Sequence, residues 1–232
     1  LGYHIRVGTN HQANAASEFE GKFIGNLNNG RYPVQVTQDN FGYNLIGNPY
    51  PSTIDANQFL ISNHNVNSIY FWTQEAPLTT NGYANNNYSS YTILGGVKAA
   101  SGGVTPTNMI SKGQGFFVKV NYSSDVIFSN ALRIPSQNVV MHRNQDQSNA
   151  KKLWLDLFEE QTPKNQILIG YTDFSTNEFD HQIDGEMFKM YDGSKLYSFI
   201  ENSSDNYIIQ GRAIQTLNED VIKLGFEAKN DG

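Results

Sequence analysis

The 232-residue sequence contains no cysteine. This absence excludes disulfide bonds, zinc sites built on thiolates, and cysteine nucleophiles. A cysteine-free chain is compatible with a bacterial extracellular protein that is stabilised by packing alone, and equally compatible with a cytosolic protein.

Charge is also scarce, with 16 lysines and arginines, 22 aspartates and glutamates, and a formal net charge of -6. This balance argues against a nucleic-acid partner, which normally leaves a basic stripe in the sequence. No stretch approaches the roughly 18 consecutive apolar residues of a membrane helix, so no transmembrane segment is predicted. No signal peptide is recognisable. Residues 1–5 are typical of a strand and residues 230–232 of a turn, so we expect a fragment of a longer protein.

Asparagine and aromatic residues are plentiful instead. The chain contains 28 asparagines, 13 tyrosines and 14 phenylalanines. The asparagine share is far above the usual value for a globular domain, so uncharged amides carry much of the polar surface. The length suffices for one large domain or two small ones, each with a buried core.

Apolar and polar residues alternate through most of the sequence, which is the period of half-buried strands. Turn signals such as Asn-Gly and Gly-Gly separate the alternating segments. We therefore predict an all-β fold of two consecutive β-sandwich domains, of jelly-roll or immunoglobulin-like type, with at most short helical turns. The predicted strands are 3–7, 18–24, 32–36, 41–46, 68–73, 90–94, 116–120, 125–129, 153–158, 166–171, 186–191, 195–200, 206–210 and 221–226.

The predicted boundary between the two domains lies in residues 135–150. This segment is polar and weakly patterned, and a structureless loop of that length is unusual inside one compact domain. The first domain is then 1–135 and the second 136–232, and we expect the second to be incomplete at its C-terminus.

Two short motifs stand out as structural. In the first, two prolines fix the backbone of a corner after a strand and a capping box follows, in which Ser52 accepts from the amide of Asp55. In the second, two glycines precede an aromatic strand, where they indicate a bulge or a close backbone approach. The motif residues are Asn48, Pro49, Tyr50, Pro51, Ser52 and Asp55, then Gly113 and Gly115.

No pattern indicates catalysis. The Gly113–Gly115 segment leads into a strand rather than a helix, so it offers no helix N-terminus to a phosphate group. No serine stands in a nucleophile elbow, and no two histidines have the spacing of metal ligands. We predict no catalytic residue, no cofactor and no metal, and we interpret the histidines as solvated loop residues. They are His4, His11, His64, His142 and His181.

Two kinds of ligand site remain as weak alternatives. Asp173, Asp180 and Asp184 lie close together in the sequence and would suit calcium, although such carboxylates more often cap turns. The aromatic residues near an Asn-rich loop would suit the flat face of a sugar, although core packing explains aromatic residues more often. The sugar candidates are Trp72, Tyr83, Tyr88 and Tyr91.

The sequence resembles a recurrent region of large secreted proteins of the Bacteroidetes, which include gliding-motility and adhesin-like surface proteins. The resemblance covers most of the chain, and its most specific part is the combination of Asn-Pro-Tyr-Pro with Gly-Gln-Gly-Phe-Phe. Tyr43 replaces a tryptophan that is typical of that family. The similar segments are 43–55, 69–72, 113–118 and 196–198, with Phe179, Asp180, Asp184 and Lys189.

The resemblance implies export by the type 9 secretion system and an extracellular or cell-surface location. In that family the region precedes a C-terminal sorting domain, and it brings no catalytic residues. The expected function is therefore a non-enzymatic structural or adhesion region whose partners are other surface or secretion-machinery proteins, with glycans as possible ligands. The alternative is a carbohydrate-binding accessory module of a secreted hydrolase.

Overall fold

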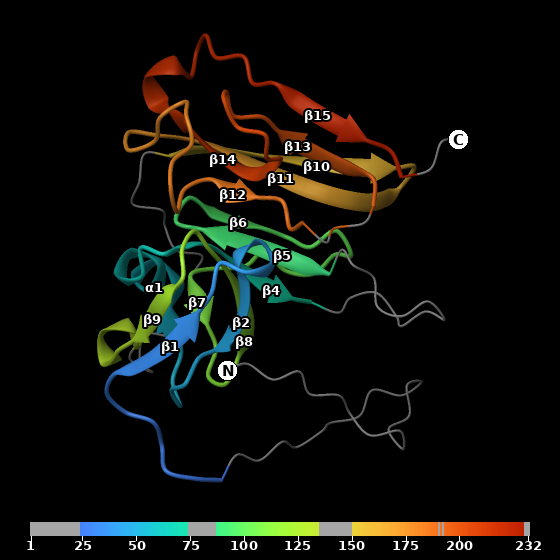
Figure 1. The fold of residues 1–232 in the computed structure, drawn as a ribbon. Helices are drawn as coiled ribbons and strands as arrows, with labels where there is room; N and C mark the ends of the chain where they lie inside the picture. Colours follow the sequence, from blue (N-terminus) through green and yellow to red (C-terminus); the bar gives the residue numbers. More distant parts are fainter. Residues whose placement is uncertain (1–23, 74–86, 135–149, 190, 192, 230–232) are drawn as a thin grey trace, which may run out of the picture.

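Figure 1 shows the computed structural model, which describes residues 24–73, 87–134, 150–189, 191 and 193–229. The fold is mostly β, as predicted, with several largely antiparallel sheets and one short α-helix in these ranges. The strand predicted at 3–7, nearly all of that at 18–24, and the predicted domain boundary up to residue 149 lie outside the described residues. The division of the chain into two domains stays a prediction.

A five-stranded antiparallel sheet forms the middle of the molecule (Figure 1). The two sequence motifs meet in it, because Gly47 pairs with Gly115 and the Asn48 amide donates to the Gln114 carbonyl at 3.0 Å. In spatial order the strands are β2 (Tyr43–Gly47), β8 (Gly115–Val120), β4 (Val66–Trp72), β5 (Tyr88–Thr92) and β6 (Gly95–Val97).

A layer of small elements covers one face of this central sheet. Phe59 of the helix packs edge-on against Phe116 and tilted against Phe128, and these rings belong to a continuous buried core. The elements of the layer are β1 (Tyr32–Val36) paired with β9 (Ser124–Phe128), β3 (Ile54–Asp55) paired with β7 (Met109–Ile110), and α1 (Ala56–Ser62). Short 3-10 helices occur at η1 (Asn40–Gly42), η2 (Asn130–Leu132) and η4 (Ile214–Thr216).

The predicted capping box is wrong, because the N-cap of the helix lies three residues after Ser52. Helix α1 begins after Asp55, whose carboxylate accepts from the amides of Asn57 and Gln58. Asp55 is therefore the N-cap itself, the role for which aspartate is strongly preferred. The Ser52 hydroxyl accepts from the Arg133 guanidinium instead, at 2.9 Å.

A second sheet covers the opposite face of the central sheet (Figure 1). Its strands are antiparallel except for β11 and β14, which run parallel. Of the described residues in the segment 186–191, predicted as a strand, only Glu186 belongs to one, β12, and Phe188 then turns into the space between the sheets. The strands are β10 (Lys151–Glu159), β11 (Thr162–Thr172), β14 (Tyr207–Ala213), β13 (Lys195–Ser198) and β15 (Leu224–Glu227), with β12 (Gly185–Glu186) beside β14.

The central sheet therefore has a core on each side. Residues 66–71 of β4 are all buried, although a strand with one solvated face would alternate. Ile69 and Phe71 belong to the core on the α1 side. Leu94 and Val97 belong to the other core, together with Leu168 of the second sheet.

Two glycines with left-handed backbone offer a matched test of this packing. Gly113 (φ +68°) has open space where a Cβ would stand, whereas at Gly42 (φ +77°) a Cβ would lie 2.3 Å from the Val120 carbonyl oxygen. Gly113→Ala should lower the free energy of unfolding by about 1–2 kcal/mol, the cost of the backbone conformation alone. Gly42→Ala should cost about 1–3 kcal/mol more, because β8 must shift. Urea unfolding measures both values, and equal losses would contradict the expected contact.

Candidate functional site

The far side of the central sheet, opposite α1, carries a row of aromatic side chains. Side chains alternate between the two faces of a strand, so residues paired across strands share a face. Tyr70 pairs with Phe117, and Trp72 pairs with Tyr88. Tyr43 lies on the same face, three positions from the core residue Ile46. We call Tyr43, Tyr70, Trp72, Tyr88 and Phe117 the aromatic face.

Phe188 fills the centre of this face. Its ring centroid lies 4.4 Å from that of Tyr88, 4.7 Å from Tyr43, 5.2 Å from Tyr70 and 6.2 Å from Phe117. Most of these distances fall in the range that aromatic pairs prefer. Phe188 comes from the second sheet's half of the chain and is only 4% exposed. The ring thus connects the second sheet to four strands of the central one, β2, β4, β5 and β8.

The predicted sugar-binding residues separate into different environments. Trp72 and Tyr88 are together, with ring centroids 4.9 Å apart in an edge-to-face arrangement, and Trp72 is 37% exposed. Tyr91 lies on the opposite face, buried in the core, where its hydroxyl donates to the Asn57 side chain. Tyr83 lies outside the described residues. The four residues therefore do not form one platform in the part of the chain that is described.

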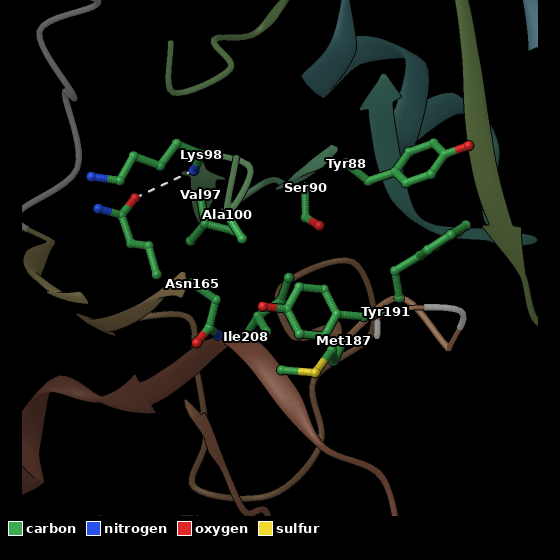
Figure 2. A pocket seen from close by; sticks show the side chains of 11 residues that line it. Tyr88, Ser90, Val97, Lys98, Ala100, Asn165, Met187, Tyr191 and Ile208 are labelled. Atoms are coloured by element: carbon green, nitrogen blue, oxygen red, sulfur yellow. Dashed lines mark hydrogen bonds between the residues drawn. The ribbon is translucent and has the colours of Figure 1, made fainter. Parts of the chain in front are cut away.

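A small pocket lies between the central and second sheets (Figure 2). Its volume is about 30 Å³, comparable with one or two water molecules and far below the usual size of a small-molecule site. Ser90, Val97 and Lys98 line one side in Figure 2, and Met187 and Tyr191 line the other. As it stands, this pocket excludes a sugar ring.

Buried amides form a polar connection between the same two layers. Asn67 is fully buried at a bulge in β4, and its side chain accepts from the Gln182 amide and donates to the Asp184 carbonyl. The Gln182 side-chain nitrogen lies 2.6 Å from the Leu60 carbonyl oxygen and 2.9 Å from that of Val66. Gln182 thus adds a second donor to the Leu60 carbonyl in the last turn of α1, which also accepts from the Asn63 amide at 3.0 Å. Sequence patterns gave no sign of either amide, because buried Asn and Gln have no periodic signature.

The three calcium candidates do not converge. Asp184 is fully buried, and its two oxygens accept from the amides of Asp180 and Gly211, each at 2.6 Å. The Asp180 carboxylate accepts from the amide and hydroxyl of Thr176, while Asp173 is exposed. Among the described residues, no three His, Asp or Glu side chains are placed to hold a metal ion. The carboxylates organise turns in this structure.

Burial dominates the electrostatics of Asp184. Loss of solvent raises the pKa of its carboxyl to about 7, although the amides of Asp180 and Gly211 favour the charged form and lower the pKa. His181 is also partly buried, with one ring nitrogen 2.9 Å from the His64 carbonyl oxygen and the other 3.0 Å from the Asn121 amide. Burial lowers the pKa of His181. This histidine is therefore not the solvated loop residue that we predicted.

The proline corner is held by the side chain of Asn48. Its amide nitrogen donates to the carbonyls of Ser52, Ser111 and Ile110, and its oxygen accepts from the Tyr50 amide. Tyr50 is buried, and its hydroxyl donates to the Gly30 carbonyl at 2.6 Å. The motif fixes the exit from β2 against the turn before β8, which is a structural role.

No helix in the described residues has the length and hydrophobicity needed to span a bilayer.

Asp184 generates a pH prediction. Its folded pKa of about 7 lies above the unfolded value of 3.8. Its contribution to stability is therefore fully present below about pH 4 and is lost as the pH rises through 7, because between these values the unfolded chain releases the proton while the buried carboxyl of the folded state retains it. In Asp184→Asn the side-chain NH2 group faces a backbone N–H, so two donors meet, and the amide side chain does not titrate.

The free energy of unfolding should therefore differ more between wild type and Asp184→Asn at pH 5 than at pH 7.5. Urea unfolding at both pH values measures the two differences. The opposing titration of His181 is present in both proteins and cancels. A difference that stays constant or grows with pH would contradict the prediction.

Comparison with known proteins identifies the family of this chain. No curated protein and no solved structure matches the sequence significantly. A family model described as a domain of unknown function, DUF8693, matches residues 1–232, which is the full length of this sequence. The description assigns no activity, so it adds no catalytic role to the aromatic face or to the buried amides. The chain belongs to the DUF8693 family.

Proposed function

We propose that this chain is a non-enzymatic structural and adhesive region of a secreted or cell-surface protein that leaves the cell by a type 9 secretion route. The observation that carries the proposal is the insertion of Phe188 among the rings of the aromatic face. The insertion joins two sheets through a contact that has no room for a substrate. Other surface or secretion-machinery proteins are the proposed partners.

The physical argument concerns stiffness. To separate the second sheet from the central one, Phe188 must leave four rings and the Asn67 and Gln182 amides must lose buried hydrogen bonds. Each of these hydrogen bonds contributes about 0.5–1.5 kcal/mol net to stability, so the joint resists bending. A module of this kind holds its surface loops at a fixed distance and orientation, and such loops carry recognition.

The proposal is tested on intact cells that express the parent protein with an epitope tag beside this region. Antibody should label the tag without permeabilisation, and external protease should leave the wild-type region intact. Phe188→Ala should become cleavable, because removing a buried Phe side chain costs about 3–5 kcal/mol. Phe174→Ala is the matched control, since that ring is 50% exposed.

Labelling that requires permeabilisation would overturn the proposed location. A Phe188→Ala protein that resists protease as well as the control would overturn the proposed joint. These two outcomes are independent of each other, so each part of the proposal is tested separately.

A carbohydrate-binding accessory module is the second candidate, because Trp72 presents part of its ring to solvent beside Tyr88. Trp72→Ala is the cleaner test of the two, because Tyr88 also packs on Phe188 and on Phe117. If glycans bind here, Trp72→Ala should weaken binding on a glycan array about tenfold or more, the value of one lost aromatic contact. Phe174→Ala should leave it unchanged. The absence of wild-type binding to polysaccharides and host glycans would exclude this candidate.

A further inference from the structure

Strand β10 forms one edge of the second sheet. Among the described strands it pairs only with β11, so its other side presents backbone N–H and C=O groups. The strand is nine residues long, and large apolar side chains remain exposed on it: Leu153 (53%), Trp154 (41%) and Phe158 (54%). A long, exposed, apolar edge of this kind is a template for another strand.

The irregularity in this hairpin does not interrupt β10. Leu157 pairs with Asn165 and the next residue, Phe158, pairs with Pro163. The extra residue at this bulge is therefore Lys164 of β11, and β10 keeps its alternation from end to end. Proteins often protect an edge with a bulge in the edge strand itself, and β10 has no such protection.

We propose that β10 pairs in antiparallel fashion with β10 of a second copy of this chain, about a two-fold axis at Leu155. The sequence Lys-Lys-Leu-Trp-Leu-Asp-Leu-Phe-Glu is self-complementary in this register. Lys151 lies opposite Glu159 of the other copy at both ends of the ladder, where Glu159 also pairs with Lys164 of its own copy. Leu153 lies opposite Leu157, and Leu155 lies opposite itself. The interface is isologous and closes as a dimer.

Each face of the joined strands also matches. Leu153, Leu155 and Leu157 share one face because side chains alternate, so the two copies form a continuous leucine ladder there. On the other face Lys152 lies opposite Phe158, a pairing that favours a cation over a ring. Asp156 on that face lies opposite Trp154 of the other copy, and its charge is already compensated by Lys98 of its own copy at 2.8 Å.

The other edge of the sheet gives a different result. Strand β15 has four residues, and its Glu227 pairs with Lys195 at 2.8 Å. Pairing of β10 with β15 of another copy would be head-to-tail and would give rings or open filaments rather than a two-fold dimer. Of these two pairings, only that of β10 with itself brings opposite charges together at both ends of the ladder and gives a closed dimer.

Sedimentation equilibrium of the purified chain over a wide range of concentrations tests the dimer. Wild type should dimerise reversibly. Lys151→Glu and Glu159→Lys should each weaken the dimer about tenfold or more, because two attractive pairs become two repulsive ones. Combining both substitutions swaps the charges and should restore most of the wild-type affinity. Circular dichroism confirms that each variant is folded.

Leu224→Lys on β15 is the matched control and should leave the dimer intact, since that edge takes no part. A wild-type chain that stays monomeric at every concentration would overturn the proposal, as would open-ended growth or a double variant as weak as the single ones. The measurement is independent of export or adhesion, so it neither relies on the proposed function nor tests it.

Discussion

Burial of both faces of the central sheet is the constraint on which the rest of the structure depends. Strand β4 places Ile69 and Phe71 in one core and turns Ser68 and Tyr70 toward the second sheet. Polar groups buried in that way must find partners, because an unsatisfied one costs about 1–3 kcal/mol. The Tyr70 hydroxyl accepts from Ser68 and donates to the Glu186 carbonyl. The second sheet therefore supplies a hydrogen-bond acceptor for a buried side chain of β4.

Strand content was readable from the sequence because alternation is a local property. The segments at 32–36, 116–120 and 153–158 coincide with β1, β8 and β10 to within three residues at either end. The strand predicted at 186–191 was wrong after Glu186, where β12 ends. Phe188 is apolar because it inserts between the two sheets, and a period of two in the sequence does not distinguish such a residue from one that packs within a strand. The arrangement of the sheets also depends on long-range pairing, such as the parallel contact of β11 with β14, which no local pattern specifies.

Motifs that act locally could be interpreted from the sequence. The corner at Asn48 and Tyr50 was recognised as structural because proline restricts its own backbone and that of its neighbour. Trp72 and Tyr88 lie together, whereas Tyr91 lies on the other face, as the alternation along β5 requires, and sugar binding by these residues stays a prediction. The contribution of Gln182 was not readable, since its partners Leu60 and Val66 lie more than a hundred residues away.

That distance along the chain has a consequence for how the protein folds during synthesis. Helix α1 and β4 leave the ribosome well before residue 182, so the hydrogen bonds that the Gln182 side chain donates to the Leu60 and Val66 carbonyls form only after the later part of the chain is synthesised. Contacts of such long sequence separation slow folding and expose partly built sheets in the interval. A nascent chain that ends before residue 182 therefore has neither Phe188 nor the second sheet to cover the aromatic rings of the central sheet.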